Sequence, residues 1–197
     1  MSSNKDIYDD YFFDRAASME GASAIRAVDV LMRHFAPRSV VDIGCGTGLY
    51  LAAFAARGAE VKGYDGSEAA ARKSPVKDKI AIRDLEKYLP ADKKYDLCLS
   101  IEVAEHLRPR AADAFVDTLA GFSDTIVFTA ATPGQGLADI GHINEQPHEY
   151  WIGKFAERGF GLEEDLTEEI KEEMAKRQVI WWVPKNLMVF KKIKANL

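Results

Sequence analysis

"VVDIGCGTGLY", residues Val40 to Tyr50, places three glycines within five positions directly behind a short apolar run. The β-branched run predicts a buried strand, and the Leu- and Ala-rich segment after the glycines predicts a helix. Because glycine has no Cβ, the backbone of the turn between them can approach a ligand, and the N–H groups of the helix start face that ligand. In an open parallel sheet, ligands bind beyond the carboxyl ends of the strands. The stretch therefore predicts an α/β fold with a ligand site at this turn.

Strands and helices are predicted to alternate along the rest of the chain. Strands are expected over residues 39–43, 60–64, 80–82, 95–100, 125–129 and 187–193. Helices are expected over 22–35 and 49–57, from Ser67 to before Pro75, from Pro109 onward, over 147–158, and as an exposed acidic helix within 162–177. Alternation of this kind requires crossover connections and a mostly parallel, doubly wound sheet. No composition shift divides the chain, so one domain over 1–197 is expected, with a lid segment at 1–21, a cofactor-binding core at 36–130 and acceptor-side and closing elements at 131–197.

The bulk composition is that of an ordinary soluble globular protein. Hydrophobic residues make up 47% of the 197 residues, and the net charge is −5. A net negative charge argues against a general nucleic-acid binder, because phosphate backbones are bound mainly by clustered Lys and Arg. The two cysteines, Cys45 and Cys98, show no zinc spacing. With no signal peptide and no long apolar run, the chain is expected to be cytoplasmic and to have no membrane span.

The glycine spacing and the nearby acids narrow the ligand class. A dinucleotide fingerprint, G-x-G-x-x-G, would need glycine where this chain has Leu49, and no Gly-Lys-Ser or Gly-Lys-Thr follows as in a P-loop. Asp42 at the strand end favours a ligand with a cationic amine or sulfonium, since a phosphate nearby would be repelled by about 1–4 kcal/mol. Asp42 could equally order the turn. Asp65, which closes the second predicted strand, can accept hydrogen bonds from ribose hydroxyls.

Four motifs in register, "VVDIGCGTGLY", "GYDGS", "RDLEKYLP" and "YDLCLSIEVAEHL", resemble the class I S-adenosylmethionine-dependent methyltransferase family. The resemblance runs from about residue 36 to residue 130, and it extends less sharply to the small bacterial branch that methylates small molecules and glycans. It implies a Rossmann-like, seven-stranded sheet with an antiparallel last strand, and S-adenosyl-L-methionine as the cofactor. It also implies cofactor-binding roles for Gly44, Gly46, Gly48, Asp65, Asp84 and Glu102. Asp84 could instead be an ordinary helix cap.

The loop over residues 130–146 is longer than most connections and follows the fifth predicted strand at the ligand edge of the sheet. It carries His142 and Glu145, while "EVAEHL" brings His106 to the end of the fourth strand. These three residues are the candidate catalytic residues, and His142 is the first candidate for a general base. No metal is predicted. A divalent ion held by His142, Glu145 and His106 remains an alternative, but the spacing is not diagnostic.

Methyl transfer to an oxygen of a small molecule or glycan is the function expected from these observations, with a nitrogen acceptor less favoured. Two alternatives remain open from the sequence. One is a methyltransferase that acts on RNA or protein, and the other is a non-catalytic module that only binds the cofactor. The sequence does not identify the acceptor or the oligomeric state.

Overall fold

The structure is a computed structural model that describes residues 10–136 and 141–194. Its strands are β1 (Ser39–Ile43), β2 (Glu60–Asp65), β3 (Ile80–Ile82), β4 (Leu97–Ile101), β5 (Thr125–Thr129), β6 (Phe160–Leu162) and β7 (Met188–Lys192). The α-helices are α1 (Asp10–Phe35), α2 (Leu49–Ala55), α3 (Glu68–Lys73), α4 (Ala112–Phe122), α5 (His148–Ala156), α6 (Glu164–Lys176) and α7 (Trp182–Asn186). Short 3₁₀ turns occupy Lys77–Lys79, Ala104–His106 and Pro109–Ala111.

The seven strands form one sheet in the order β3-β2-β1-β4-β5-β7-β6. β1 pairs in parallel with both β2 and β4, so the strand order reverses at β1. β7 runs antiparallel to β5 and to β6. The predicted doubly wound, mostly parallel seven-stranded sheet with an antiparallel last strand is confirmed. The reversal places the turn after β1 at the position where ligands bind in such sheets.

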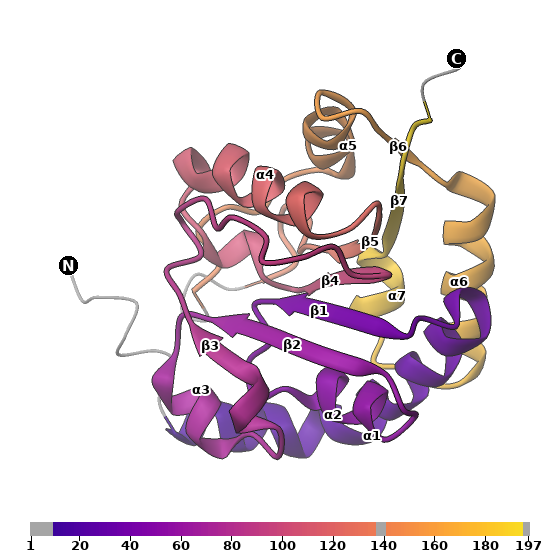
Figure 1. Ribbon diagram of the computed structural model, residues 1–197. Helices are drawn as coiled ribbons and strands as arrows, with labels where there is room; N and C mark the ends of the chain where they lie inside the picture. Colours follow the sequence, from indigo (N-terminus) through magenta and orange to yellow (C-terminus); the bar gives the residue numbers. More distant parts are fainter. Residues whose placement is uncertain (1–9, 137–140, 195–197) are drawn as a thin grey trace.

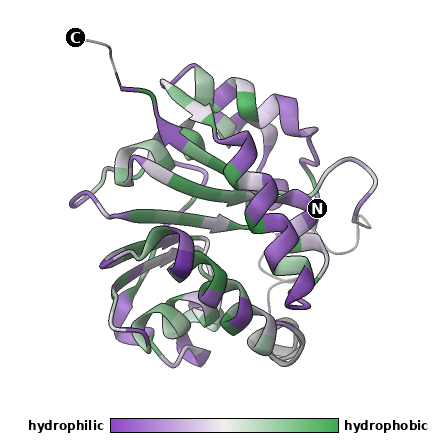
Figure 2. Cartoon of the chain, turned by 90° about the vertical axis from the view of Figure 1, so that its right-hand side faces the viewer, coloured by the Kyte–Doolittle hydropathy of each residue, from purple (hydrophilic) through white to green (hydrophobic). Residues whose placement is uncertain are grey.

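Two apolar layers cover the two faces of the sheet. α1, α2 and α6 bury side chains such as Leu31, Phe54 and Ile170 on one face, and α4 and α5 bury Phe115 and Trp151 on the other. Figure 1 shows α1, α2 and α3 below the strands and α4 and α5 above them. The strands are mostly hydrophobic, whereas hydrophilic residues lie along the helices (Figure 2). A sheet covered on both faces must read as continuous apolar runs, as these strands do.

The predicted elements agree with the structure except near the two ends of the chain. The helix predicted over 22–35 begins at Asp10 in the structure. The short strand β6 and the helix α7 were not predicted. The predicted acidic helix exists as α6, but it is not exposed all round, because Thr167, Ile170 and Met174 are buried against the rest of the protein. The proposed lid begins in residues 1–9, which lie outside the described residues. Residues 10–21, which complete that segment, belong to the first turns of α1.

None of the helices in the described ranges has both the length and the apolar character that a membrane span requires.

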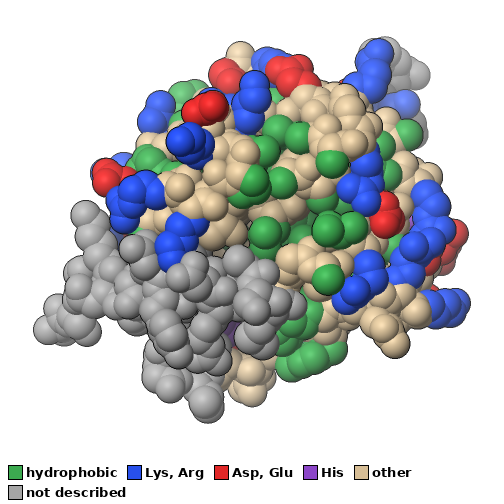
Figure 3. Space-filling model, turned by 90° about the horizontal axis from the view of Figure 1, so that it is seen from below, with side chains coloured by type: hydrophobic (Ala, Val, Ile, Leu, Met, Phe, Trp, Pro, Cys, Tyr) green, Lys and Arg blue, Asp and Glu red, His purple; other side chains and the backbone are tan. Residues whose placement is uncertain are grey.

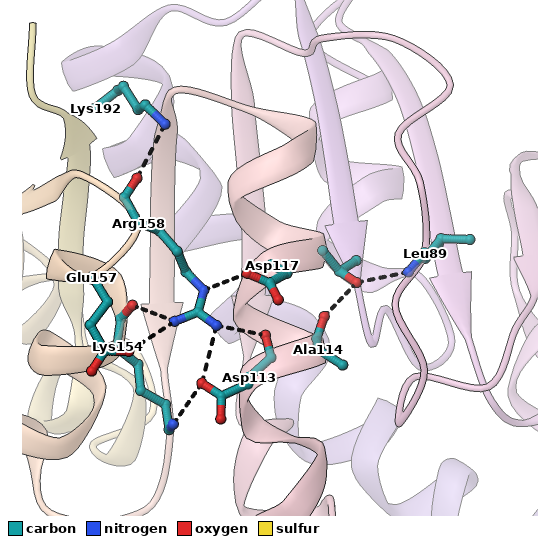
Figure 4. Close-up of polar contacts among 9 residues, drawn as sticks. Leu89, Asp113, Ala114, Asp117, Lys154, Glu157, Arg158 and Lys192 are labelled. Atoms are coloured by element: carbon teal, nitrogen blue, oxygen red, sulfur yellow. Dashed lines mark hydrogen bonds and ion pairs between the residues drawn. The ribbon is translucent and has the colours of Figure 1, made fainter.

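An ion-pair network fastens α5 to α4 (Figure 4). The Arg158 guanidinium, just after α5, donates to Asp117 Oδ1 at 2.6 Å and to Asp113 Oδ1 at 3.1 Å. It also donates to the main-chain oxygens of Asp113 and Lys154, and the Lys154 ammonium donates to Asp113 Oδ1 at 2.8 Å. Several charges share these contacts, and the Arg158 side chain is largely buried, so the network stabilises more than an isolated surface pair would. It fixes the helix that follows the long loop.

Arg158→Met is expected to lower the free energy of unfolding by about 1–2 kcal/mol, because the five hydrogen bonds of the guanidinium at a partly buried site are lost. The melting temperature should fall by about 2–8 °C, measured by circular dichroism. Lys176→Met is the matched control, since it removes only an exposed pair with Glu172 on α6. Equal melting temperatures for the two variants would show that the network contributes nothing to stability.

Candidate functional site

The glycine turn between β1 and α2 combines two close contacts with one open position. A Cβ on Gly44 would overlap the Val103 side chain, and a Cβ on Gly48 would lie 2.8 Å from Ser74 Oγ. A Cβ on Gly46 would meet no atom of the described residues within 4 Å. All three residues have positive φ, and Gly46 has φ 52°. Gly44 and Gly48 therefore serve packing inside the protein, whereas Gly46 faces open space at the edge of the sheet.

Asp65, the last residue of β2, holds this turn in place. Its carboxylate accepts a hydrogen bond from the Gly46 N–H at 2.7 Å and another from the Ser67 N–H at 2.8 Å. Burial raises the pKa of Asp65 above its usual value, and the N–H groups of Ser67, Gly46 and Gly66 counteract that rise. Asp65 thus connects the turn after β1 to the turn after β2, and its carboxylate lies beside the open position at Gly46.

Further acidic side chains are buried or partly buried near the turn. Asp42 is 2% exposed, and its Oδ1 has no hydrogen-bond partner among the described residues. Burial and the nearby Asp65 raise the pKa of Asp42 to about 8. Burial and the charge of Glu102 raise the pKa of Glu20, on α1, to about 7. The pKa of Tyr50 is also raised, mainly by burial and in addition by the negative charges of Glu20, Asp42 and Glu102. A cluster of acids that has no Lys or Arg partner among the described residues suits a positively charged ligand.

Glu102, directly after β4, adopts an unusual backbone conformation that aims its carboxylate. Its φ is 53°, a left-handed value that is rare for residues other than glycine. Its N–H donates to the Thr129 main-chain oxygen at 3.2 Å and to Thr129 Oγ1 at 2.8 Å. The carboxylate accepts from Asn186 Nδ2 at 3.0 and 3.2 Å. Burial raises the pKa of Glu102, although the hydrogen bond from Asn186 acts in the opposite direction. Such strain at a ligand edge is typical of functional positions.

Glu105 organises the opposite side of the site. Its side chain is fully buried, and its Oε1 accepts a hydrogen bond from the Ala131 N–H at 3.1 Å. Its main-chain oxygen accepts from the N–H groups of Ile143 and Asn144 at 2.9 and 3.0 Å. Burial and the nearby Glu102 raise the pKa of Glu105 well above its usual value. Glu105 therefore holds the long loop after β5 near its start, at Ala131, and near its end, at Ile143 and Asn144.

His142 and Glu145 form a pair within this loop. His142 Nδ1 lies 2.8 Å from Glu145 Oε1. The N–H groups of Gly134 and Gly136 also donate to the Glu145 carboxylate, at 2.7 and 2.6 Å. A Cβ on Gly136 would overlap the imidazole of His142, so only glycine permits this approach. Burial alone would raise the pKa of Glu145, but the hydrogen bonds from His142 and the two glycines hold it below its usual value. Glu145 is thus occupied in orienting His142.

His106 lies against His142. The two ring centroids are 4.8 Å apart and the rings meet edge to face. His106 Nδ1 lies 3.2 Å from the main-chain oxygen of Gly141. Burial and the charge of His142 lower the pKa of His106 to about 4, so its imidazole is neutral at neutral pH. The candidate catalytic residues His142, His106 and Glu145 are therefore brought together at one place.

Asp84 is set apart from the other sequence-predicted site residues. Its side chain is 52% exposed after β3, where its Oδ2 pairs with Lys87 Nζ at 3.0 Å. Its Oδ1 accepts from the Glu86 N–H at 3.1 Å, in a turn and not at a helix start. Hydrogen bonds from Lys87 and Glu86 lower its pKa. An adenine-binding role for Asp84 stays a prediction.

Sequence reasoning missed Glu20, Glu105 and Asn186. Glu105 was visible within "EVAEHL", three residues after Glu102, but nothing in the sequence indicated that it would be buried. Glu20 and Asn186 are far from the recognised motifs in the sequence, so only the fold brings them to the site. The sequence suggested His142, Glu145 and His106 as an alternative set of metal ligands. Among the described residues, the side chains close enough to share an ion are instead Glu105, His106 and His142.

Comparison with known proteins places the chain in a family. A family model described as a methyltransferase domain matches residues 17–126, more than half of the chain. A search of curated proteins returns no match. Among solved structures, the methyltransferase in a complex with the Trm112 activator from Haloferax volcanii is similar, with 16% identity and a TM-score of 0.67 over 92% of this chain and 94% of that one.

Two further structures have the same fold. Magnesium protoporphyrin IX methyltransferase from Synechocystis PCC 6803, with bound S-adenosylmethionine, is 21% identical and has a TM-score of 0.62 over 82% of this chain and 88% of that one. The O-methyltransferase of a polyketide synthase from Brevibacillus brevis, in complex with S-adenosyl-L-homocysteine, is 18% identical, with a TM-score of 0.60 over 86% and 72% of the two chains. The chain therefore belongs to the methyltransferase-domain family and is an S-adenosylmethionine-dependent methyltransferase of the class I fold.

Proposed function

We propose that this enzyme methylates an oxygen of a small molecule or glycan. The observation that carries the proposal is the His142–Glu145 pair, which lies beside His106 next to the buried acids of the ligand edge. An oxygen nucleophile must lose a proton when it is methylated, and an oriented imidazole is the commonest group to receive one. A nitrogen acceptor is the less favoured alternative, because a neutral amine can attack without prior loss of a proton.

We propose that the cofactor binds between the glycine turn and the buried acids. The open position at Gly46 and the unpartnered Oδ1 of Asp42 fit a ligand that carries positive charge. Asp42 and Glu102 would face its cationic groups, and Asp65 would accept hydrogen bonds from its ribose while it still holds the turn. When bound, S-adenosylmethionine supplies a methyl group on a good leaving group. Gly44 and Gly48 would keep the turn in the shape that admits it, and Asp84 would lie toward the adenine.

On the acceptor side, we propose that Glu145 orients His142 and that His142 Nε2 receives the proton of the acceptor hydroxyl. Glu145 stabilises the positive charge that then develops on the imidazole, as a carboxylate does beside a histidine base. His106 forms a wall against which the His142 ring rests. The segments at 1–21 and 131–197 would then close the site on the acceptor side, as expected for a one-domain enzyme.

An RNA or protein acceptor is the alternative. The net charge of −5 disfavours RNA, since phosphates are bound mainly by clusters of Lys and Arg. Figure 3 shows one face of the molecule, on which Lys and Arg lie in several separate places with apolar side chains between them.

Incubation with methyl-labelled S-adenosylmethionine and a metabolite extract is expected to yield labelled methyl ethers of low molecular mass, detected by mass spectrometry. Protein and RNA fractions from the same cells, supplied in parallel, should stay unlabelled. Label in either macromolecular fraction, with none among the small molecules, would contradict the proposed acceptor class.

Gly46→Ala is expected to lower the affinity for S-adenosylhomocysteine at least tenfold, because the added methyl group enters the space proposed for the ligand. The fold should be kept, since that methyl group meets no described atom within 4 Å and the cost is limited to backbone strain at a positive φ, which the control below shares. Gly58→Ala is the matched control. It also adds a Cβ at a positive φ, with nothing within 4 Å, but at the far end of α2. Calorimetry that gives the two variants equal affinity would place the ligand elsewhere.

His142→Ala is expected to lower kcat by about 10²–10⁴-fold, the range for loss of a general base, with little change in the affinity for S-adenosylhomocysteine. His34→Gln removes a histidine that pairs with Glu173 at the end of α1 and should leave the rate unchanged. Initial rates with the identified acceptor measure the effect. A His142→Ala enzyme that retains its full rate would assign His142 a structural role.

A further inference from the structure

We propose that Glu105, His106 and His142 bind one divalent first-row transition-metal ion. These three residues, called here the imidazole–carboxyl cluster, each offer a ligand atom, and the three atoms all lie within 4.8 Å of one another. The cluster joins the 3₁₀ turn after β4 to the loop after β5. Neither segment contains a zinc-type sequence motif, so the site is created by the fold.

The donor set favours a transition metal. Two imidazoles and one carboxylate are the protein ligands of many catalytic Zn²⁺ sites, in which the remaining position is left for water or substrate. Imidazole nitrogen suits ions such as Zn²⁺ and Co²⁺ better than it suits Mg²⁺ or Ca²⁺, which prefer oxygen ligands. With three protein ligands, the ion retains a position that an acceptor oxygen can occupy.

A second, independent observation comes from the Glu105 carboxyl group. Glu105 is fully buried, and its Oε2 accepts no hydrogen bond from an N–H group of the described residues. Its carboxyl group is hydrogen-bonded to that of Glu102, which is partly buried close by, so two acids share one small space. Such a pair is costly to ionise, and the described surroundings of the two acids include no Lys or Arg partner. A cation at the cluster would satisfy Oε2 and attract both acids.

The surroundings of the two imidazoles are those of metal ligands. A metal-binding histidine almost always gives its second ring nitrogen to a carboxylate or a main-chain oxygen, which fixes the ring and the tautomer. Here Nδ1 of His142 lies 2.8 Å from Glu145 Oε1, and Nδ1 of His106 lies 3.2 Å from the Gly141 oxygen. Glu145 is in turn held by the N–H groups of Gly134 and Gly136. Glu145 is thus a positioning residue for the His142 ligand.

Binding of the ion does not depend on the proposed methyl acceptor, but its consequence for the reaction rests on the proposed function. An ion held by the cluster would occupy the His142 nitrogen to which the proposed function assigns the acceptor proton, so it would replace His142 as the group that activates the acceptor. It would lower the pKa of an acceptor hydroxyl bound to it, and the hydroxyl proton would leave to solvent. An oxygen acceptor fits this arrangement because a divalent cation binds and polarises it directly.

The test uses the full chain after treatment with a chelator, without cofactor or acceptor. Titration with Zn²⁺ by calorimetry, and with Co²⁺ by visible absorption, is expected to give one ion per chain. Glu105→Gln and His142→Gln should each lower the affinity at least tenfold, because each removes a ligand. Glu145→Gln should lower it by about 10–100-fold, the usual effect of losing a carboxylate behind a ligand. His34→Gln is the matched control, with the same change of side chain outside the cluster.

Circular dichroism establishes that each variant is folded. Should Glu105→Gln unfold, because Glu105 also anchors the loop, His142→Gln provides the same test from the loop side. Absence of stoichiometric binding, or equal binding by His142→Gln and His34→Gln, would overturn the proposal. Methyl ether formation by a protein that binds no ion would contradict the ion site and retain the proposed function. Ion binding together with label only in RNA or protein would support the ion site and contradict the proposed function.

Discussion

The carboxylate of Asp65 is the contact on which the shape of the proposed cofactor site depends. It accepts one hydrogen bond from an N–H group of the turn after β1 and one from the turn after β2. It therefore sets the distance between the two turns that border the site. The parallel register of β1 and β2 brings this about, because Ile43 pairs with Tyr64 and the next residue along β2 is Asp65. A hydrogen bond to a charged group contributes about 1.5–3 kcal/mol. Two such bonds offset part of the cost of burying the carboxylate.

Acidic side chains shielded from solvent are the basis for proposing that the site binds a positively charged ligand. Asp42, Glu20 and Glu102 come from a central strand, from α1 and from the end of β4, and burial raises the pKa of each of them. Such groups are costly to ionise unless a positive charge lies among them. On the proposed placement of the cofactor, a cationic ligand meets this condition and the pyrophosphate of a dinucleotide does not. This argument from charge agrees with the glycine spacing, in which Leu49 stands where a dinucleotide fingerprint would need glycine.

Much of the fold could be predicted from the sequence because the central strands are continuous apolar runs bounded by glycine, proline and helix caps. β6 has glycine at the centre of its three residues, whereas the equally short β3 is an unbroken apolar run that could be predicted. α7 has five residues and contains Pro184, so it gives no helical pattern. At the site, the turn and Asp65 could be predicted because parallel strands place their carboxyl ends at one edge. The roles of Glu105 and Asn186 could not, since they arise from packing between segments distant in sequence. Likewise, no sequence pattern indicated that the N–H groups of Gly134 and Gly136 and the His142 imidazole would all hydrogen-bond to the Glu145 carboxylate.

A crystal structure of the protein with S-adenosylhomocysteine tests the central claim most directly. The proposed site predicts that the ligand lies against Gly46, with its ribose hydroxyls on the Asp65 carboxylate and its ammonium group facing the buried acids around Asp42. The Asp65 contacts to Gly46 and Ser67 should persist in the complex. A ligand bound away from Gly46, or one whose ribose makes no contact with Asp65, would contradict the claim.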